Sequence, residues 1–438
     1  MNNLRLLTGL LMTALCSGGA AAYGQGQVMS IEEIFDFAEA RSAQLRPVFR
    51  AVGEAELDVS VARAARLPEI NAALSVSYIG DGFTTARDFS DRQKAPIPHL
   101  GDGFSVTLSQ PLYTGGVISS GIELAELKST AARYAADLKR DNIRLTLTGQ
   151  YLDLYKCANL RSVVESNLAA ARKVLDEMRS RYSQGTALKN DITRYELLVS
   201  NLELQLVKLD NTLDILNTSL VTTAGLPAGT VVVPDSTILA RSLPVRDEAA
   251  WHDEAEECSP SLRLAASNLD ISRKAERIVR AERLPKVGIN AGWSIDGPIL
   301  VEVPPINRNL SYWYVGVGVS YNLSSLYKSN KTVARSRAAT LRAADELDAV
   351  REEVGLALHT DHVKYLEAYE ELKTQRKSVE LAVSNYRTVA TRYSADMALI
   401  TDLLDAANSR LDAEQRLVNA RIDIIYYYYK LLFTSGKI

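Results

Sequence analysis

The chain has 438 residues, a formal net charge of −3 and a pI near 6.0. A balanced charge of this kind lacks the basic stripe that a phosphate backbone needs, so we expect no nucleic-acid partner. The sequence contains no G-x-S-x-G, no phosphate-cradling glycine loop and no H-E-x-x-H. We therefore expect neither enzyme activity nor a cofactor.

The amino terminus has the pattern of a secretory signal. A basic residue precedes an apolar run over 6–15, and small residues follow, which predicts a signal peptide over 1–24 cleaved after Ala22 or Gly24. Cys16 leaves a lipid-modified start open, although the residue before it is not the small one that such sites prefer. The pattern predicts a chain that leaves the cytoplasm.

The first elements after the signal are a helix and two strands. A capping box from Ser30 to Glu33 opens the helix, which pauses around Ser42 and ends near Arg66. RLPEINAALSVSY then changes to a period of two and predicts a strand at about 69–78. After a polar loop over 79–103, FSVTLSQPL predicts a second strand at about 104–112.

A helix of unusual length follows, from about 116 to 182. It contains no proline, and at ~1.5 Å per residue it is roughly 100 Å long. A turn in RYSQGTALKND, 181–191, leads into a return helix over about 187–224. Apolar residues spaced by three and four form a heptad seam on the return helix: Ile192, Tyr195, Val199, Leu202, Leu206, Leu209, Leu213, Leu216 and Leu220. The outgoing helix carries Val164, Leu168, Ala171, Leu175, Met178 and Tyr182, so we expect an antiparallel coiled-coil hairpin.

The same order recurs after a proline-rich linker over 227–246. Ser259-Pro260 predicts a helix start, strands are expected at about 286–295 and 312–323, and a second long helix at about 328–393. RYSADMALITD, 392–402, matches the first turn. The chain is therefore predicted to contain two repeats, 28–226 and 247–438, with two β-hairpins and four strands in all.

Strands with one apolar face are usually part of a soluble sandwich, but little else here could form its second sheet. The other interpretation is a membrane barrel, whose strands need ~9–11 residues that alternate between lipid and lumen. Four strands cannot close a barrel, so closure requires two or three copies. The residues predicted to face lipid are Leu74, Val76, Phe104, Val106, Trp293, Val315, Val317 and Val319. Those predicted to face the lumen are Ser75, Ser105, Gly316 and Gly318.

His359 and His362 could share one face of the second long helix. No Glu or His follows at a spacing that would complete a metal site, so a solvated helix face is favoured and no metal is expected.

The sequence resembles the TolC-like outer-membrane efflux family. The resemblance is carried by the opening at Ser30–Glu33, the RLP-to-strand joins at 66 and 283, SQPLYTGG at 109–116, and RYSQGTALKND. It implies a mainly α protein with a membrane β part, in which three copies form a twelve-stranded outer-membrane barrel continued by a helical tunnel across the periplasm. It also implies a passive conduit in a tripartite efflux or type I secretion system, coupled to an inner-membrane pump through a periplasmic adaptor. The alternative is a secreted or periplasmic coiled-coil scaffold without a pore.

The two helix-hairpin turns are the candidate partner sites under this resemblance. The expected adaptor contacts are Gly185, Thr186, Leu188, Asp396, Met397 and Leu399. Tyr182, Asp191, Tyr393 and Asp402 are expected at the periplasmic entrance. The simpler interpretation is a pair of capped helix turns, with Gly185 replaced by Asp396 in the second repeat.

Overall fold

The computed structural model describes residues 26–240, 243–302 and 305–438, so the predicted signal peptide and Cys16 lie outside the described residues. The chain divides into two compact units. The first contains the described residues of Met1–Ser42, Thr146–Ser242 and Ala368–Tyr426; the second contains Ala43–Leu145, Leu243–Glu367 and Tyr427–Ile438. Each unit thus takes residues from both sequence repeats.

In the first unit, α1 (Ile31–Arg41) begins with the predicted capping box. The Glu33 amide donates to the Ser30 hydroxyl at 3.2 Å, and the Ser30 amide donates to the Glu33 carboxylate at 2.8 Å. The helix ends at Arg41, and α2 (Arg46–Ala64) begins in the second unit, which confirms the pause at Ser42. The predicted linker contains two regular elements: β6 (Val232–Pro234), which pairs in parallel with β1 (Gln27–Met29), and a short 3-10 helix at Ser236–Ala240.

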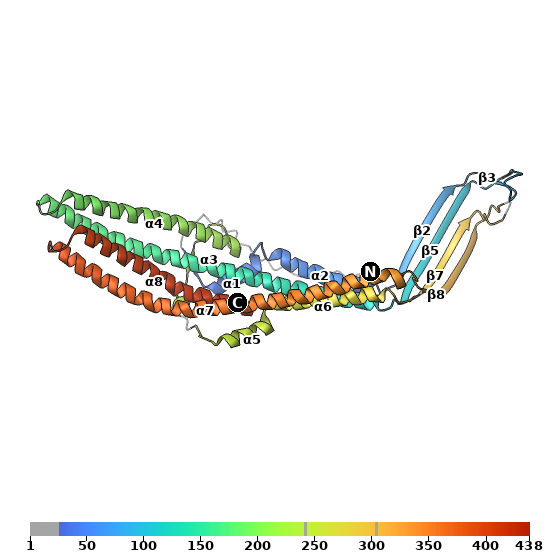
Figure 1. The fold of residues 1–438 in the computed structure, drawn as a ribbon. Coiled ribbons are helices and arrows are strands. Elements are labelled where there is room, and N and C mark those ends of the chain that lie inside the picture. The colour runs from blue at the N-terminus through green and yellow to red at the C-terminus, as the bar shows by residue number, and fades with distance from the viewer. Residues whose placement is uncertain (1–25, 241–242, 303–304) are drawn as a thin grey trace, which may run out of the picture. The chain divides into compact units, whose positions relative to one another are not determined.

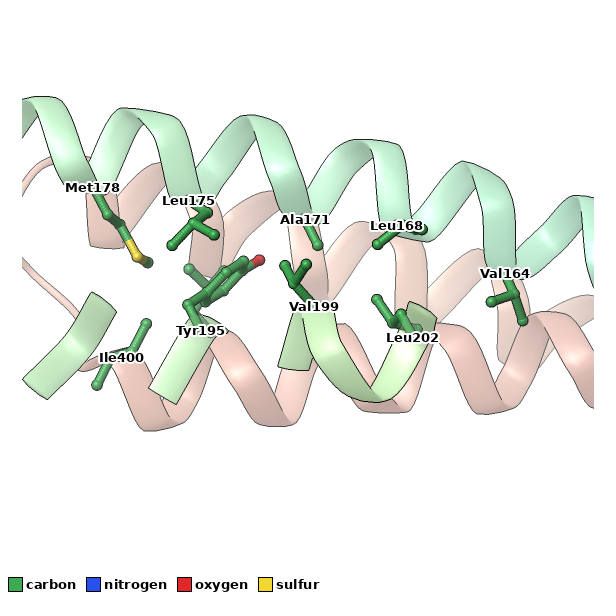
Figure 2. Close-up of a cluster of buried hydrophobic side chains, with 10 residues drawn as sticks. Val164, Leu168, Ala171, Leu175, Met178, Tyr195, Val199, Leu202 and Ile400 are labelled. Atoms are coloured by element: carbon green, nitrogen blue, oxygen red, sulfur yellow. The ribbon is translucent and has the colours of Figure 1, made fainter. Parts of the chain in front are cut away.

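The coiled-coil hairpin of the first repeat is confirmed. Helix α3 (Val117–Ser183) packs against α4 (Lys189–Ala224) in the first unit. Figure 2 shows the buried cluster, which consists of Val164, Leu168, Ala171, Leu175, Met178, Tyr195, Val199 and Leu202 with Ile400 and Leu403. Tyr182 is the exception: the heptad pattern assigned it to the seam, but its side chain is 46% exposed because α3 ends one residue later.

The second repeat forms α7 (Ser325–Ser394) and α8 (Ile400–Ser435), again joined by a short turn. Its connecting helices are α5 (Glu248–Cys258) and α6 (Pro260–Ala281), and Pro260 occupies the first turn of α6 as predicted. Among the described residues, no helix combines the length and apolar character needed to cross a membrane.

The second unit holds a four-stranded antiparallel sheet in the order β2-β5-β7-β8 (Figure 1). The strands are β2 (Glu69–Tyr78), β5 (Leu100–Tyr113), β7 (Lys286–Gly297) and β8 (Leu310–Ser320). The order joins the two predicted hairpins through β5 and β7.

The strands differ from prediction at several of their ends and by an additional hairpin. β5 begins at Leu100, because pairing with β2 continues to Tyr78 through two glycines that break the apolar pattern. β8 ends at Ser320 instead of residue 323, because Asn322 accepts a hydrogen bond from the Ser324 amide at 3.1 Å and starts α7. The polar loop contains a further hairpin of β3 (Gly82–Thr84) and β4 (Gln93–Ala95), so the prediction of only four strands was wrong.

Candidate functional site

The register of the sheet places all eight residues predicted to face lipid on one face. Directly opposite residues of antiparallel strands point to the same side. Leu74 pairs with Phe104, Val106 with Trp293, and Val317 with Ile289. Because successive residues alternate, the remaining members lie on this face too.

The apolar face is strongly exposed on the edge strands β2 and β8 and partly exposed on β5 and β7. Leu74 is 76% exposed and Val317 is 69% exposed, values more typical of polar residues on a soluble protein. Trp313 pairs with Trp293 on the same face and is 74% exposed, although it was not among the predicted residues; the alternation along β8 was its signal. A continuous exposed apolar face of this kind marks a surface made for another apolar phase or partner.

The opposite face consists mainly of small and polar residues, together with Tyr312 and Tyr314. Ser105 lies opposite Ser294, and Gly318 lies opposite Gly288, so the residues predicted to face the lumen share one face with each other. Ser75 donates to the Gly103 carbonyl at 3.5 Å on this side. The two faces of one sheet therefore differ sharply in polarity, while its edge strands β2 and β8 each pair on one side within the chain.

The two helix-hairpin turns have the same backbone. At the end of α3, the Gly185 amide donates to the Tyr182 carbonyl at 2.9 Å and the Thr186 amide to the Arg181 carbonyl at 3.0 Å. At the end of α7, the Asp396 amide donates to the Tyr393 carbonyl at 3.1 Å and the Met397 amide to the Arg392 carbonyl at 2.8 Å. Both patterns are Schellman motifs, which need a left-handed residue.

That left-handed residue differs between the repeats. Gly185 has φ 77° and Asp396 has φ 58°, so aspartate adopts the same conformation as glycine. Aspartate tolerates it better than most residues. Its carboxylate also receives a hydrogen bond from the guanidinium of Arg181, at the end of the other hairpin. Arg181 further approaches the Tyr393 carbonyl at 3.4 Å and lies 5.9 Å from the Tyr393 ring centre.

Arg181 was not among the predicted site residues. It belongs to the Arg-Tyr-Ser sequence that precedes both turns, but its contact with Asp396 joins positions 215 residues apart. Only the three-dimensional packing of the two hairpins could reveal it.

Of the predicted entrance residues, Asp191 and Tyr393 lie close enough for the charge of one to affect the other. Tyr393 is half-buried, and burial together with the negative charge of Asp191 raises the pKa of its hydroxyl, while Arg181 opposes the rise. Asp402 has a structural role, because its carboxylate accepts from the Leu399 amide at 3.1 Å at the start of α8.

The predicted adaptor contacts include three strongly exposed apolar side chains. Leu188 is 68% exposed, Met397 72% and Leu399 70%. They lie between the helices of each hairpin, outside the ranges of α3, α4, α7 and α8. Apolar residues at the end of a helical hairpin can serve as anchors for a helical partner.

An exposed sheet with one apolar and one polar face, whose strand β5 runs directly into a helix of 67 residues, defines a class of membrane-inserted proteins with long helical extensions. A model of the outer membrane efflux protein family matches residues 35–226 and 251–426. The chain belongs to this family. It is therefore an outer-membrane protein of efflux transport, and the scaffold alternative is not favoured.

Individual relatives agree with this assignment. The outer membrane efflux protein BepC of Brucella suis is 22% identical over 387 residues, covering 87% of this chain and 79% of BepC. The pyoverdine export outer membrane protein OpmQ of Pseudomonas putida is 22% identical over 400 residues, covering 88% of this chain and 81% of OpmQ.

Solved structures share the fold. The outer membrane protein VceC of Vibrio cholerae superposes with a TM-score of 0.77 at 13% identity, covering 93% of this chain and 96% of VceC. The CmeC outer membrane channel of Campylobacter jejuni gives 0.74 at 11% identity, covering 100% of this chain and 94% of CmeC.

Proposed function

We propose that the protein is the outer-membrane channel of a tripartite efflux or type I secretion system. Outer-membrane efflux channels are in general trimeric and work with periplasmic adaptors and inner-membrane pumps. In this proposal the chain is a passive conduit from the periplasm to the exterior, and a pump reached through an adaptor supplies the energy. It acts as a conduit and not as an enzyme.

The observation that carries the proposal is the sheet with two different faces and two edge strands. Open strand edges are not tolerated in hydrocarbon, because unpaired backbone groups cannot reach water there. Three copies that join β8 of one to β2 of the next remove every edge and give twelve strands. The apolar face then meets lipid and the serine- and glycine-rich face lines a lumen.

The helix-hairpin turns supply the proposed partner site. Gly185 and Asp396 shape the turns, and Leu188, Met397 and Leu399, with Thr186 beside them, offer the adaptor exposed contacts. Tyr182, Asp191, Tyr393 and Asp402 are proposed to lie near the periplasmic entrance. The contact of Arg181 with Asp396 then holds the ends of the two hairpins of one copy together, which favours a closed entrance.

A pair of substitutions on the sheet tests the proposal. A charged residue at the lipid-facing midplane of a barrel costs ~2–4 kcal/mol, and much less on the lumen side. Val317→Arg should therefore abolish trimer assembly and membrane insertion. Gly318→Ser should not, because a side chain there meets only the flexible amide of Asn290, at 3.3 Å.

The readouts are trimer content in detergent and single-channel conductance in planar bilayers. The parent and Gly318→Ser should both conduct. If both substitutions are tolerated equally, the assignment of one face of the sheet to lipid and the other to the lumen is wrong. A well-folded parental trimer without conductance would instead favour a scaffold.

A further inference from the structure

Three of the four histidines of the chain gather around one carboxylate in the second unit. Glu248 and His252 lie one turn apart on α5, and His359 and His362 lie one turn apart on α7. The His359 Nδ1 atom is 2.9 Å from Glu248 Oε1, His252 Nε2 is 3.6 Å from the same oxygen, and His362 Nδ1 is 3.7 Å from Oε2. Sequence spacing alone did not predict this cluster, because Glu248 and His359 are 111 residues apart in the chain.

His362 lies between two hydrogen-bond acceptors. Its Nε2 atom is 3.2 Å from the backbone carbonyl of Arg246, and its Nδ1 atom faces the Glu248 carboxylate at an ion-pair distance. A neutral imidazole has one N–H, so it can donate to only one of the two. The doubly protonated ring can donate to the Arg246 carbonyl and also direct a positive charge toward the Glu248 carboxylate. The side chain is only 11% exposed, so water has little access to make up the difference.

Several other charged side chains near α5 form ion pairs that do not involve Glu248. Arg246 pairs with Glu254 at 2.8 Å and lies over the Trp251 ring, and Arg351 pairs with Glu256 at 3.0 Å. Lys430 of α8 pairs with Asp361 at 2.9 Å, and Lys437, just after the end of α8, lies 3.9 Å from Glu254. Over residues 26–240, 243–302 and 305–438, every ion pair of Glu248 is to a histidine.

The cluster does not have the arrangement of a metal site. In the described part of the chain, no group of three or more His, Cys, Asp or Glu side chains is placed to hold a metal ion. The chemistry left to a carboxylate among imidazoles is proton binding.

We propose that Glu248, His359 and His362 form a proton-operated clasp that fastens α5 to α7 when the surroundings become mildly acidic. Histidine is the side chain that gains a positive charge on mild acidification, and here each added charge faces the Glu248 carboxylate. The hydrogen bond from His359 and the nearby histidine charges hold the pKa of Glu248 below its usual range, so the carboxylate stays ionised under these conditions. A proton bound by His359 or His362 places a positive charge beside this carboxylate, at 2.9 and 3.7 Å respectively.

The clasp acts beside a packed anchor. Trp251 of α5 is fully buried and makes an edge contact with Tyr428 of α8, at 6.3 Å between ring centres. This contact carries no titratable charge at these pH values, so it keeps α5 in place when the histidines are neutral. Acidification therefore stabilises an existing contact between α5 and α7. The expected signal is a lower frequency of local unfolding of α5.

Hydrogen–deuterium exchange of the α5 amides in the full-length protein tests the clasp. Exchange is compared at pH 7.5 and pH 6.0 after correction for the chemical exchange rate at each pH. We expect α5 to become roughly two- to fivefold more protected at pH 6.0, the range that partly exposed ion pairs give. Amides of α4, which has no histidine, provide an internal reference.

Three variants separate the clasp from general effects of acid. Glu248→Gln keeps a hydrogen-bonding side chain without the charge, and His362→Gln keeps a donor that cannot be protonated. Glu248→Gln should leave α5 equally protected at the two pH values, while His362→Gln should reduce the response to the part that His359 supplies. His99→Gln removes the histidine outside the cluster and should respond as the parent does. Parental protection that does not change with pH, or a full response in Glu248→Gln, would overturn the proposal.

Discussion

The two helix-hairpin turns show how one backbone motif is maintained by different side chains. Both turns close with the same pair of backbone hydrogen bonds, and both have a residue in the left-handed conformation at the same position. The first uses Gly185, which takes this conformation without steric cost. The second uses Asp396, which bears some strain but gains a charged contact with Arg181. The two repeats thus share the geometry of the turn, but only the second has a left-handed residue whose side chain contacts the other hairpin.

The return helices differ in a similar way. Counted from the shared Arg-Tyr-Ser sequence, Ala406 of α8 stands where α4 has Tyr195, and both are almost fully buried. The seam of α8 continues with the buried residues Ala413 and Ala420, where the pattern of α4 is rich in leucine. Equal spacing therefore does not mean equal volume, and the two hairpins are packed with different side chains.

The largest expected effect comes from removing the exposed anchors of both turns. Leu188→Ser combined with Leu399→Ser should leave trimer assembly and membrane insertion intact, because neither side chain is buried. Export and adaptor cross-linking should fall about tenfold or more, as for central anchors of an interface. The two single variants show whether the turns contribute equally.

Leu197→Ser is the matched control, because Leu197 is 63% exposed on α4 but lies outside the turn. It should export at the parental level. If the double variant also exports at that level, both turns are only structural and the adaptor contact lies elsewhere.

The second effect concerns packing of the return helices. Tyr195→Ala should cost ~3–5 kcal/mol, because it empties a fully buried aromatic site. Ala406→Tyr should cost ~1–3 kcal/mol by overpacking. Urea unfolding followed by helix content measures both. A neutral Ala406→Tyr would mean that the second hairpin has room for the larger side chain and that the two seams are equivalent.

The long elements could be predicted because their signals are local. The alternation along β2 and the heptads of α4 each repeat several times within one segment, so the pattern outweighs single exceptions. The three-residue strands β1, β3, β4 and β6 were missed, because a strand of that length contains no period to detect. The pairing of β5 with β7 depends on two segments far apart in the chain.

The candidate site shows the same difference between features with a local sequence signal and features that depend on contacts between distant segments. The two faces of the sheet could be predicted because residues alternate between them within each strand. The register, which the sequence did not give, then places the apolar faces of neighbouring strands on the same side. The contact of Arg181 with Asp396 and the gathering of His359 and His362 around Glu248 each join distant helices. Their residues look like ordinary charges on a helix surface until the packing is known.

The third effect isolates the left-handed position. Gly185→Ala should destabilise the first turn by about 1 kcal/mol, because a non-glycine residue is strained at positive φ. A Cβ atom there meets nothing within 4 Å, so the cost is conformational and not steric. Gly53→Ala is the control with the opposite sign: Gly53 lies inside α2, also in open space, and alanine should stabilise that helix by ~0.5–1 kcal/mol. Local hydrogen exchange at each site measures both; equal signs would show that conformation does not control the turn.

The smallest effect isolates the charge at the second turn. Asp396→Asn keeps a residue that tolerates the left-handed conformation and removes only the negative charge that faces Arg181. Asp396 is 74% exposed, so the ion pair is screened by water and we expect a coupling of ~0.2–1 kcal/mol, toward the lower end. A double-mutant cycle of Asp396→Asn with Arg181→Gln, read from exchange of the turn amides, measures it. The coupling should shrink when salt is raised to about 1 M, because screening then acts within ~3 Å. A coupling that is zero at low salt would show that Asp396, like Gly185, serves the backbone alone and that the two turns are equivalent after all.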